Sequence, residues 1–418
     1  MDMRWSVLFF FASLSLVVPM TTQAQSGSSQ LGVVDARLES LRRSEREALS
    51  PLLARGPIAF VGFSGDHELP AVVLATEVEG SPDCIMDVLG SPERYPRFMS
   101  ALQSTQIRHQ DEQEVSYDWT WQLGFLRLRG RSSLTRFSSQ RSADQRRSRL
   151  LAMQNVGGDL GRGRMLWRAY PLEGERSLLV FSSRIDMRAS NYLTRQMSSA
   201  GNSINRSVNI SLAFMMMMSV RDEVARMRGA TPRVAQSLPA LVEPQLELTA
   251  LAPLLARGDL VSLDESSEST QQLLVLSRTW RSPSVVWPVM TNPDVFGRAL
   301  VQGSRARVIE RSDTGATFEW SIPIPMVGSE GRMRLEHRPG VVHVDGLSGH
   351  LSESAWRFRL HRLPWGEAAI VGWSRFDPAD ASWMLATLIE DTPYLRGGIA
   401  VAGKVMIVRS LRSRLRTL

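Results

Sequence analysis

The sequence PLLARG stands at residues 51–56 and again at residues 253–258, an offset of 202 residues. A single six-residue match in a chain rich in leucine and arginine carries little weight unless other matches keep the same spacing. Further matches follow in the same order: Ser81-Pro82 with Ser282-Pro283, Pro92 with Pro293, Asp118-Trp119 with Glu319-Trp320, Gly130-Arg131 with Gly331-Arg332, Trp167 with Trp356, and Arg184 with Arg375. The offset is 201 residues up to Gly331 and 189 to 191 residues after it. The chain therefore predicts two tandem copies of one unit, the first with an insertion.

Length and composition agree with a folded chain of two units. The protein has 418 residues, of which 43% are hydrophobic and 22% are charged, and this excludes a disordered protein. The one cysteine, Cys84, excludes an intramolecular disulfide framework and a cysteine-based zinc site. Glycine and proline between the copies are typical of a linker. We predict a first domain over residues 31–235, a linker over 236–244 and a second domain over 245–418.

The first residues have the pattern of a secretory signal. An apolar run at residues 5–20 follows a short charged start and precedes a polar stretch that ends in Ala24. This pattern predicts a signal peptide over residues 1–24, and therefore an exported protein of the periplasm or the extracellular space. An uncleaved N-terminal anchor is the alternative, although the run is shorter than the ~20 apolar residues of a typical membrane span.

Each copy shows the same coarse order of predicted elements. An amphipathic helix comes first, and a β-branched run follows it. Two short helices come next, the first at a serine-proline pair, because serine caps a helix and proline suits its first turn. About six strands and a long terminal helix complete each copy. The predicted ranges in the two copies are 72–78 and 273–280 for the β-branched run, 102–185 and 303–376 for the strands, and 191–228 and 379–416 for the terminal helix.

This order resembles the START-like superfamily, also called SRPBCC, which includes START lipid carriers, polyketide cyclase/aromatases and coenzyme-Q-binding proteins. Residues 77–88 and 92–98 carry the resemblance, and residues 280–283 and 292–296 are its degenerate second copy. The resemblance implies an α+β fold of two tandem helix-grip domains, each a curved antiparallel sheet wrapped around a long C-terminal helix. It also implies a cavity for an apolar ligand.

Large apolar side chains are the candidates for lining such a cavity. Strand side chains alternate between faces, so Tyr117, Trp119 and Trp121 share one face. The long helix of the first copy is apolar nearly all round and contains four consecutive methionines, which adapt to irregular apolar shapes. An ordinary packed core is the alternative for all of these residues. The candidate ligand-binding residues are Tyr117, Trp119, Trp121, Trp167, Phe214, Met215, Met218, Phe318, Trp320, Trp356 and Met406.

Two polar pairs are retained in both copies, namely Arg184 with Asp186 and Arg375 with Asp377. Each pair lies at the end of a strand, just before the terminal helix. We expect the acid to cap that helix, or the pair to orient the polar head of a ligand. Lys404, the one lysine of the chain, interrupts the apolar second helix, and we expect it to point outward.

Arginine accumulates in two places with few acidic neighbours. These clusters are candidates for contact with anionic lipid headgroups, and a solvated surface is the alternative. No motif for nucleic-acid binding is present, and none is expected of an exported protein. The cluster residues are Arg136, Arg141, Arg146, Arg147 and Arg149 in the first copy, and Arg409, Arg412 and Arg416 in the tail.

Catalytic constellations are scarce. The histidines show no HExxH or paired helical spacing, so the sequence predicts no metal site and no cofactor. We therefore expect exported, non-enzymatic binding or transport of a hydrophobic small molecule, such as a lipid, a quinone or a polyketide-like compound. One alternative is a cyclase or aromatase whose acid–base candidates are Tyr117, Tyr170, Arg184 and Asp186. The other is an interaction module for a membrane surface or a protein, with filled cavities.

Overall fold

The computed structural model describes most of both predicted copies. The described residues are 43–62, 72–124, 126–141, 147–186, 202–230, 241, 243–264, 271–298, 304–322 and 328–416. The predicted signal peptide and most of the predicted linker lie outside these residues.

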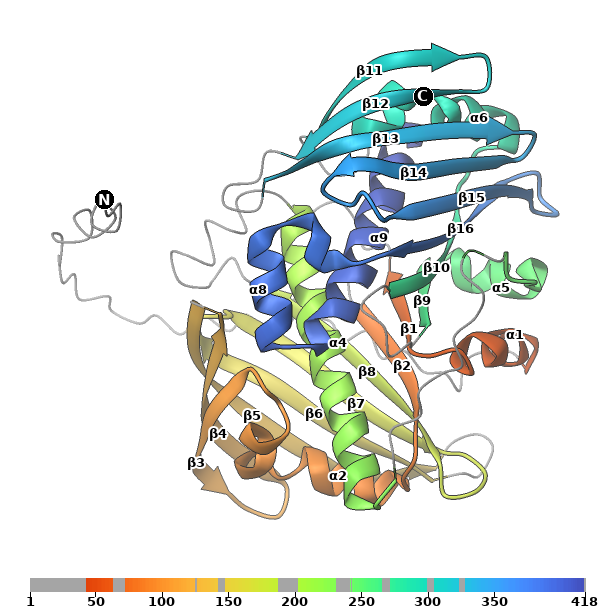
Figure 1. Cartoon of the computed structure of the whole chain (residues 1–418). Helices are drawn as coiled ribbons and strands as arrows, with labels where there is room; N and C mark the ends of the chain where they lie inside the picture. Colours follow the sequence, from red (N-terminus) through yellow and green to blue (C-terminus); the bar gives the residue numbers. More distant parts are fainter. Residues whose placement is uncertain are drawn as a thin grey trace, which may run out of the picture. The chain divides into compact units, whose positions relative to one another are not determined.

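The first copy runs from a helix through a series of strands to a long helix (Figure 1). Ser81 caps its second helix as predicted, since the Ser81 side chain accepts a hydrogen bond from the Cys84 backbone N–H at 3.3 Å. Its elements are α1 (Arg43–Leu53), β1 (Ile58–Gly62), β2 (Val72–Val78), α2 (Pro82–Leu89), the 3₁₀ helix η2 (Pro92–Arg97), β3 (Leu102–Gln110), β4 (Glu114–Leu123), β5 (Leu126–Arg141), β6 (Arg147–Gly158), β7 (Arg162–Pro171), β8 (Ser177–Asp186) and α4 (Asn202–Met227).

The described part of the second copy repeats this order, and two short helical elements precede its terminal helix. Its elements are α5 (Leu248–Leu255), β9 (Gly258–Asp264), β10 (Gln271–Arg278), α6 (Pro283–Thr291), α7 (Pro293–Arg298), β11 (Arg305–Ser312), β12 (Gly315–Ile322), β13 (Ser329–Arg338), β14 (Val341–Gly349), β15 (Ala355–Arg362), β16 (Ala368–Phe376), the 3₁₀ helix η4 (Pro378–Ala381), α8 (Trp383–Asp391) and α9 (Tyr394–Arg416).

The prediction of one helix over 379–416 is wrong, because the described chain forms three helical segments there. Ser382 starts a new helix by accepting a hydrogen bond from the Leu385 backbone N–H at 3.2 Å. Pro393 then separates α8 from α9, since proline has no N–H and disfavours a helical residue before it.

The described strands form one antiparallel sheet of sixteen strands, so the fold is α+β. The order in the sheet is β11-β12-β13-β14-β15-β16-β10-β9-β1-β2-β8-β7-β6-β5-β4-β3. Each copy contributes one continuous half of this order.

β1 and β9 join the two halves, and both strands directly follow a PLLARG segment. Ile58 pairs with Ser262, and Phe60 pairs with Leu260. The 202-residue offset relates Ile58 to Leu260 and Phe60 to Ser262, so each of the two pairs corresponds to the other. The joint between the two halves is therefore symmetric. The sequence analysis missed both strands, because a strand that is buried on both faces lacks the alternation of polar and apolar residues.

The terminal helices α4 and α9 pack against each other (Figure 1). A Cβ atom on Gly398 would lie 2.8 Å from the Cα atom of Ser211, and one on Gly397 would lie 2.7 Å from the Phe214 ring. The close approach therefore depends on these two glycines. It also explains why α4 is apolar nearly all round, since one side packs on its own sheet and another on α9.

Candidate functional site

The inner face of β4 is the first wall of the site. Tyr117, Trp119 and Trp121 are all buried, whereas the intervening Asp118 and Thr120 are partly exposed, so the predicted alternation is confirmed. Trp119 lies across from Gly130 on β5, and a Cβ atom there would come within 2.2 Å of the indole. Glycine at this position lets the indole lie flat over the neighbouring strand.

A cavity of about 30 Å³ lies between this wall and α4. That volume holds about two water molecules. Among the described residues, its lining contains no charged side chain. The lining residues are Tyr95, Met99, Leu102, Tyr117, Trp119, Trp121, Leu123, Leu128, Ser132, Met153, Asn155, Leu160, Met165, Ile185, Leu212 and Met216.

Three polar side chains form a relay in the cavity wall. The Trp119 indole N–H donates to the Ser132 hydroxyl at 2.9 Å, and the Ser132 hydroxyl donates to Asn155 Oδ1 at 2.8 Å. The indole nitrogen is only a donor, so the Ser132 hydroxyl accepts from Trp119 and uses its own proton for the bond to Asn155 Oδ1. Asn155 Nδ2 is therefore the end of the relay. It is buried and has no hydrogen-bond partner among the described residues.

Two tyrosines supply the remaining polar atoms of the cavity wall. The Tyr95 hydroxyl donates to the Leu89 carbonyl oxygen, so it is already used. The Tyr117 hydroxyl donates to the thioether sulfur of Met153, at 3.8 Å, and such a sulfur is a weak acceptor. Burial raises the pKa of Tyr117, and its interaction with Ser132 offsets this only in part. Tyr117 is therefore a neutral hydrogen-bond donor.

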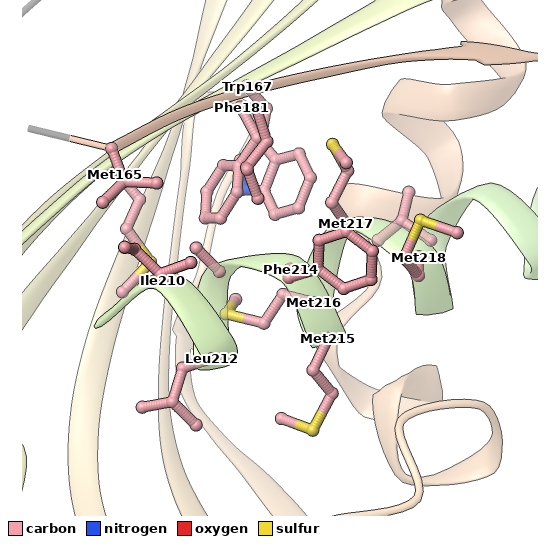
Figure 2. Packing of buried hydrophobic residues seen from close by; sticks show 14 of the residues in the cluster. Met165, Trp167, Phe181, Ile210, Leu212, Phe214, Met215, Met216, Met217 and Met218 are labelled. Carbon is pink, nitrogen blue, oxygen red and sulfur yellow. The ribbon is translucent and has the colours of Figure 1, made fainter. Parts of the chain in front are cut away.

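The helix side of the site differs from the sequence prediction. Of the four consecutive methionines, Met216 lines the cavity and Met215 and Met218 do not, although all are buried. Met217 projects toward the stacked rings of Trp167 and Phe181, and Met215 projects away from them (Figure 2). Phe214 packs against the glycines of α9. An apolar face does not reveal which side chains pack and which leave a gap.

Trp167 is also core rather than cavity wall. Its side chain is fully buried and stacks on Phe181 with the ring centroids 3.8 Å apart. The predicted residues Phe318, Trp320 and Trp356 of the second copy are buried in that copy's apolar cluster, and Met406 is half-buried.

The expectation that Lys404 points outward is wrong. Its side chain is fully buried, and Nζ lies 4.7 Å from the centroid of the Phe358 ring with no hydrogen-bond partner among the described residues. Burial lowers the pKa of Lys404 to about 7. The aliphatic stem and the attraction of the ring for the ammonium allow this placement.

Of the two polar pairs, the second is described more fully. Asp377 accepts a hydrogen bond from the Ala379 N–H at 2.9 Å, so it caps η4 rather than the long helix. It also pairs with Arg396 in the first turn of α9, at 3.3 Å. Arg184 is half-buried on β8, Arg375 is half-buried on β16, and the side chain of Asp186 lies outside the described part of the chain. Arg184, Arg375 and Asp377 do not line the cavity.

The predicted basic surface is wrong for two of its arginines. Arg412 is buried and pairs with buried Asp259 at 3.0 Å, and Arg409 lies 3.4 Å from the same carboxylate. Both arginines therefore have partners within the protein, and Arg409 also donates to the Val61 carbonyl oxygen of β1 at 3.2 Å. The sequence separation of 153 residues between Asp259 and Arg412 conceals the ion pair from sequence analysis.

The insertion arginines that are described also have protein partners. Arg149 pairs with Asp83 at 2.6 Å, and Arg136 donates to the Gly90 carbonyl oxygen at 2.7 Å. Arg146 and the side chains of Arg141, Arg147 and Arg416 lie outside the described residues.

The described residues offer neither a metal site nor a membrane-spanning helix. They contain no group of three or more histidine, cysteine, aspartate or glutamate side chains placed to hold a metal ion. None of their helices is both long enough and apolar enough to cross a membrane.

Part of the first copy is similar to a known protein family. The family model described as polyketide cyclase / dehydrase and lipid transport matches residues 78–201, which include both short helices and every cavity-lining strand. The first copy is a START-like domain. No curated protein matches the sequence significantly.

The similarity of this chain to solved structures is weak. A fragment of a STAR-related lipid transfer protein from Xanthomonas axonopodis is 11% identical, covers 40% of this chain and 93% of its own, and has a TM-score of 0.33. The Zhui aromatase/cyclase from a Streptomyces species is 17% identical, covers 40% of this chain and 98% of its own, and has a TM-score of 0.30. The di-domain aromatase/cyclase StfQ from the steffimycin biosynthetic pathway is 10% identical, covers 82% of this chain and 98% of its own, and has a TM-score of 0.29. Scores this low carry no argument about this chain's ligand.

The sequence analysis missed the two most informative polar residues of the START-like domain. Ser132 could have been found, because alternation along β5 places it on the same face as Leu128 and Leu134. Asn155 could have been found in the same way, because alternation along β6 places it on the same face as Leu151 and Met153.

Proposed function

We propose that this protein binds a hydrophobic small molecule in the cavity of its START-like domain, between the sheet and α4, without chemically changing it. The helix-grip arrangement of each copy is part of this proposal. The observation that carries it is the lining itself, which is apolar, uncharged and still contains an unsatisfied buried amide. A packed core normally satisfies its buried polar groups, whereas a binding cavity keeps a few for its ligand.

The cavity must widen to accept such a ligand. Small-molecule sites usually measure about 300–1,000 Å³. Four methionines line this cavity, namely Met99, Met153, Met165 and Met216. Methionine is unbranched and changes rotamer readily, so a ligand can displace these side chains at little energetic cost.

The composition of the lining supports binding rather than catalysis. General acid–base catalysis needs groups that exchange protons near neutral pH. The described lining has no carboxylate, histidine, lysine or arginine, and its two tyrosines have pKa values that burial raises above their ordinary value. Of the acid–base candidates with described side chains, namely Tyr117, Tyr170 and Arg184, only Tyr117 lies in the cavity.

Native mass spectrometry tests the proposal, on the protein as purified and after exposure to a lipid extract. We expect an added mass that solvent extraction releases as an unchanged hydrophobic compound. An empty protein that takes up nothing from the extract would contradict the proposal. Mass analysis of the N-terminus also tests the proposed export, for which a mature chain beginning at residue 25 is the expected result.

A further inference from the structure

The relay in the cavity wall ends on a hydrogen-bond donor. Trp119, Ser132 and Asn155 are 5%, 1% and 4% exposed, and the relay leaves Asn155 Nδ2 with no partner among the described residues. Leaving a buried amide group unsatisfied costs free energy, and Asn155 also lines the cavity, so its Nδ2 atom is a candidate donor to a ligand.

The second copy shows that the fold does not require these polar groups. Trp119 pairs with Gly130 in the first copy, and Trp320 pairs with Gly331 in the second. In both copies the pairing with the following strand shifts register between the first and the second residue after that glycine. A glycine with positive φ, Gly158 or Gly349, lies opposite each of these glycines. The backbone is therefore the same at this point in both copies.

The side chains at this shared point are not the same. Tyr117, Ser132 and Asn155 of the first copy correspond to Phe318, Met333 and Gly346 of the second. Each change removes a polar side chain. The second copy thus builds the same corner of the sheet from apolar residues, and the polar set of the first copy serves something other than folding.

The polarity of the free groups defines the complementary ligand. Asn155 Nδ2 and the weakly engaged Tyr117 hydroxyl are both donors, and the Asn155 oxygen is already occupied by Ser132. The lining offers no charge to balance an ion, and an unpaired ion in an apolar cavity is strongly disfavoured. The matching ligand is neutral, apolar and carries an oxygen acceptor.

We propose that the first copy recognises a neutral hydrophobic molecule through a carbonyl oxygen that accepts a hydrogen bond from Asn155 Nδ2, and that the second copy binds none. This inference rests on the proposed function, because it names the ligand class of the same cavity. Ketones, quinones and esters belong to this class.

Fluorenone and fluorene test the inference, since they share a ring system and differ in the carbonyl. Equilibrium dialysis should show that the full chain binds fluorenone about tenfold more tightly than fluorene, the value of one well-formed hydrogen bond in a buried site. Native mass spectrometry should show one fluorenone per chain. The infrared carbonyl band of bound fluorenone should shift to lower wavenumber.

Three variants locate the effect. Asn155→Leu keeps the volume and removes the donor, and the double variant Ser132→Met with Asn155→Gly installs residues that the second copy already accommodates. Both should bind the two probes equally and lose the infrared shift. Met333→Leu, at the position equivalent to Ser132, should behave as the natural protein does.

The possible failures are distinguishable. Equal affinity of the natural protein for both probes, a preference that survives in Asn155→Leu, or two fluorenones per chain would each overturn this inference while leaving hydrophobic binding intact. Binding of neither probe, together with no uptake from a lipid extract, would overturn the proposed function as well.

Discussion

Asn155 and Lys404 each bury a side-chain nitrogen that has no hydrogen-bond partner among the described residues, yet the surroundings of the two nitrogens differ. Asn155 borders a cavity, whereas Lys404 packs on the ring of Phe358. Alternation along a strand predicted the inner positions of Tyr117 and Trp119, because that rule needs only local sequence. It could not predict Lys404, whose burial is decided by residues that come together only in the folded chain.

Lys404 predicts a pH dependence of stability. Burial lowers its pKa from 10.5 to about 7 in the folded protein, while the unfolded chain keeps the ordinary value. Between these two pH values the unfolded state binds more protons, so folding stability rises with pH by up to about 1.4 kcal/mol per unit. Below about pH 7 both states are protonated, and the full penalty remains.

Lys404→Met removes this titration and keeps an unbranched side chain against Phe358. We expect the variant to be roughly 2–5 kcal/mol more stable than the natural protein at pH 7, with a difference that shrinks toward pH 10. Urea unfolding at several pH values measures it. A constant difference at every pH would show that the ammonium of Lys404 does not lose its proton in the fold.

At the scale of elements, the repeated order of helices and strands was predictable because periodicity and serine-proline caps are local signals. The sequence analysis missed β1 and β9 because their burial on both faces removes the period-two pattern. It also ran η4, α8 and α9 together, since their apolar residues continue across Pro393. The pairs of both joints, β1 with β9 and α4 with α9, lie about 200 residues apart in the chain.

The packing of α4 on α9 predicts opposite effects for two glycines of one helix. A Cβ atom on Gly398 would meet the Ser211 backbone at 2.8 Å, whereas one on Gly403 would meet only the edge of the Phe376 ring at 4.0 Å. We expect Gly398→Ala to destabilise the protein by about 1–3 kcal/mol through overpacking. Gly403→Ala should stabilise it by about 0.5–1 kcal/mol through helix propensity. Thermal unfolding of both variants measures the difference, and equal effects would contradict the close helix contact.

For the whole molecule, the two copies share a backbone plan and differ in what they enclose. They build one sixteen-stranded sheet, and in both an acidic residue on the outer face of the sheet is flanked by two arginines, Asp118 in the first and Glu319 in the second. The first encloses a cavity with a polar relay, and at the equivalent positions the second carries apolar residues or glycine. Duplication was readable from the sequence because matched residues keep their spacing. The difference between what the two copies enclose could not be read from the sequence, because it depends on which side chains meet across strands.

This asymmetry predicts that ligand binding responds to one long helix and not to the other. Met216 of α4 lines the cavity, and half-buried Met406 is a methionine of α9 outside the cavity lining. Met216→Trp fills the space that a ligand would occupy, and Met406→Trp makes the same chemical change away from it.

The most direct measurement is the mass bound per chain, determined by native mass spectrometry after exposure of the natural protein and both variants to the same lipid extract. We predict one hydrophobic molecule per chain in the natural protein and in Met406→Trp, and an empty Met216→Trp that is still folded by circular dichroism. Equal uptake by Met216→Trp, or loss of uptake only in Met406→Trp, would contradict a binding site in the first copy.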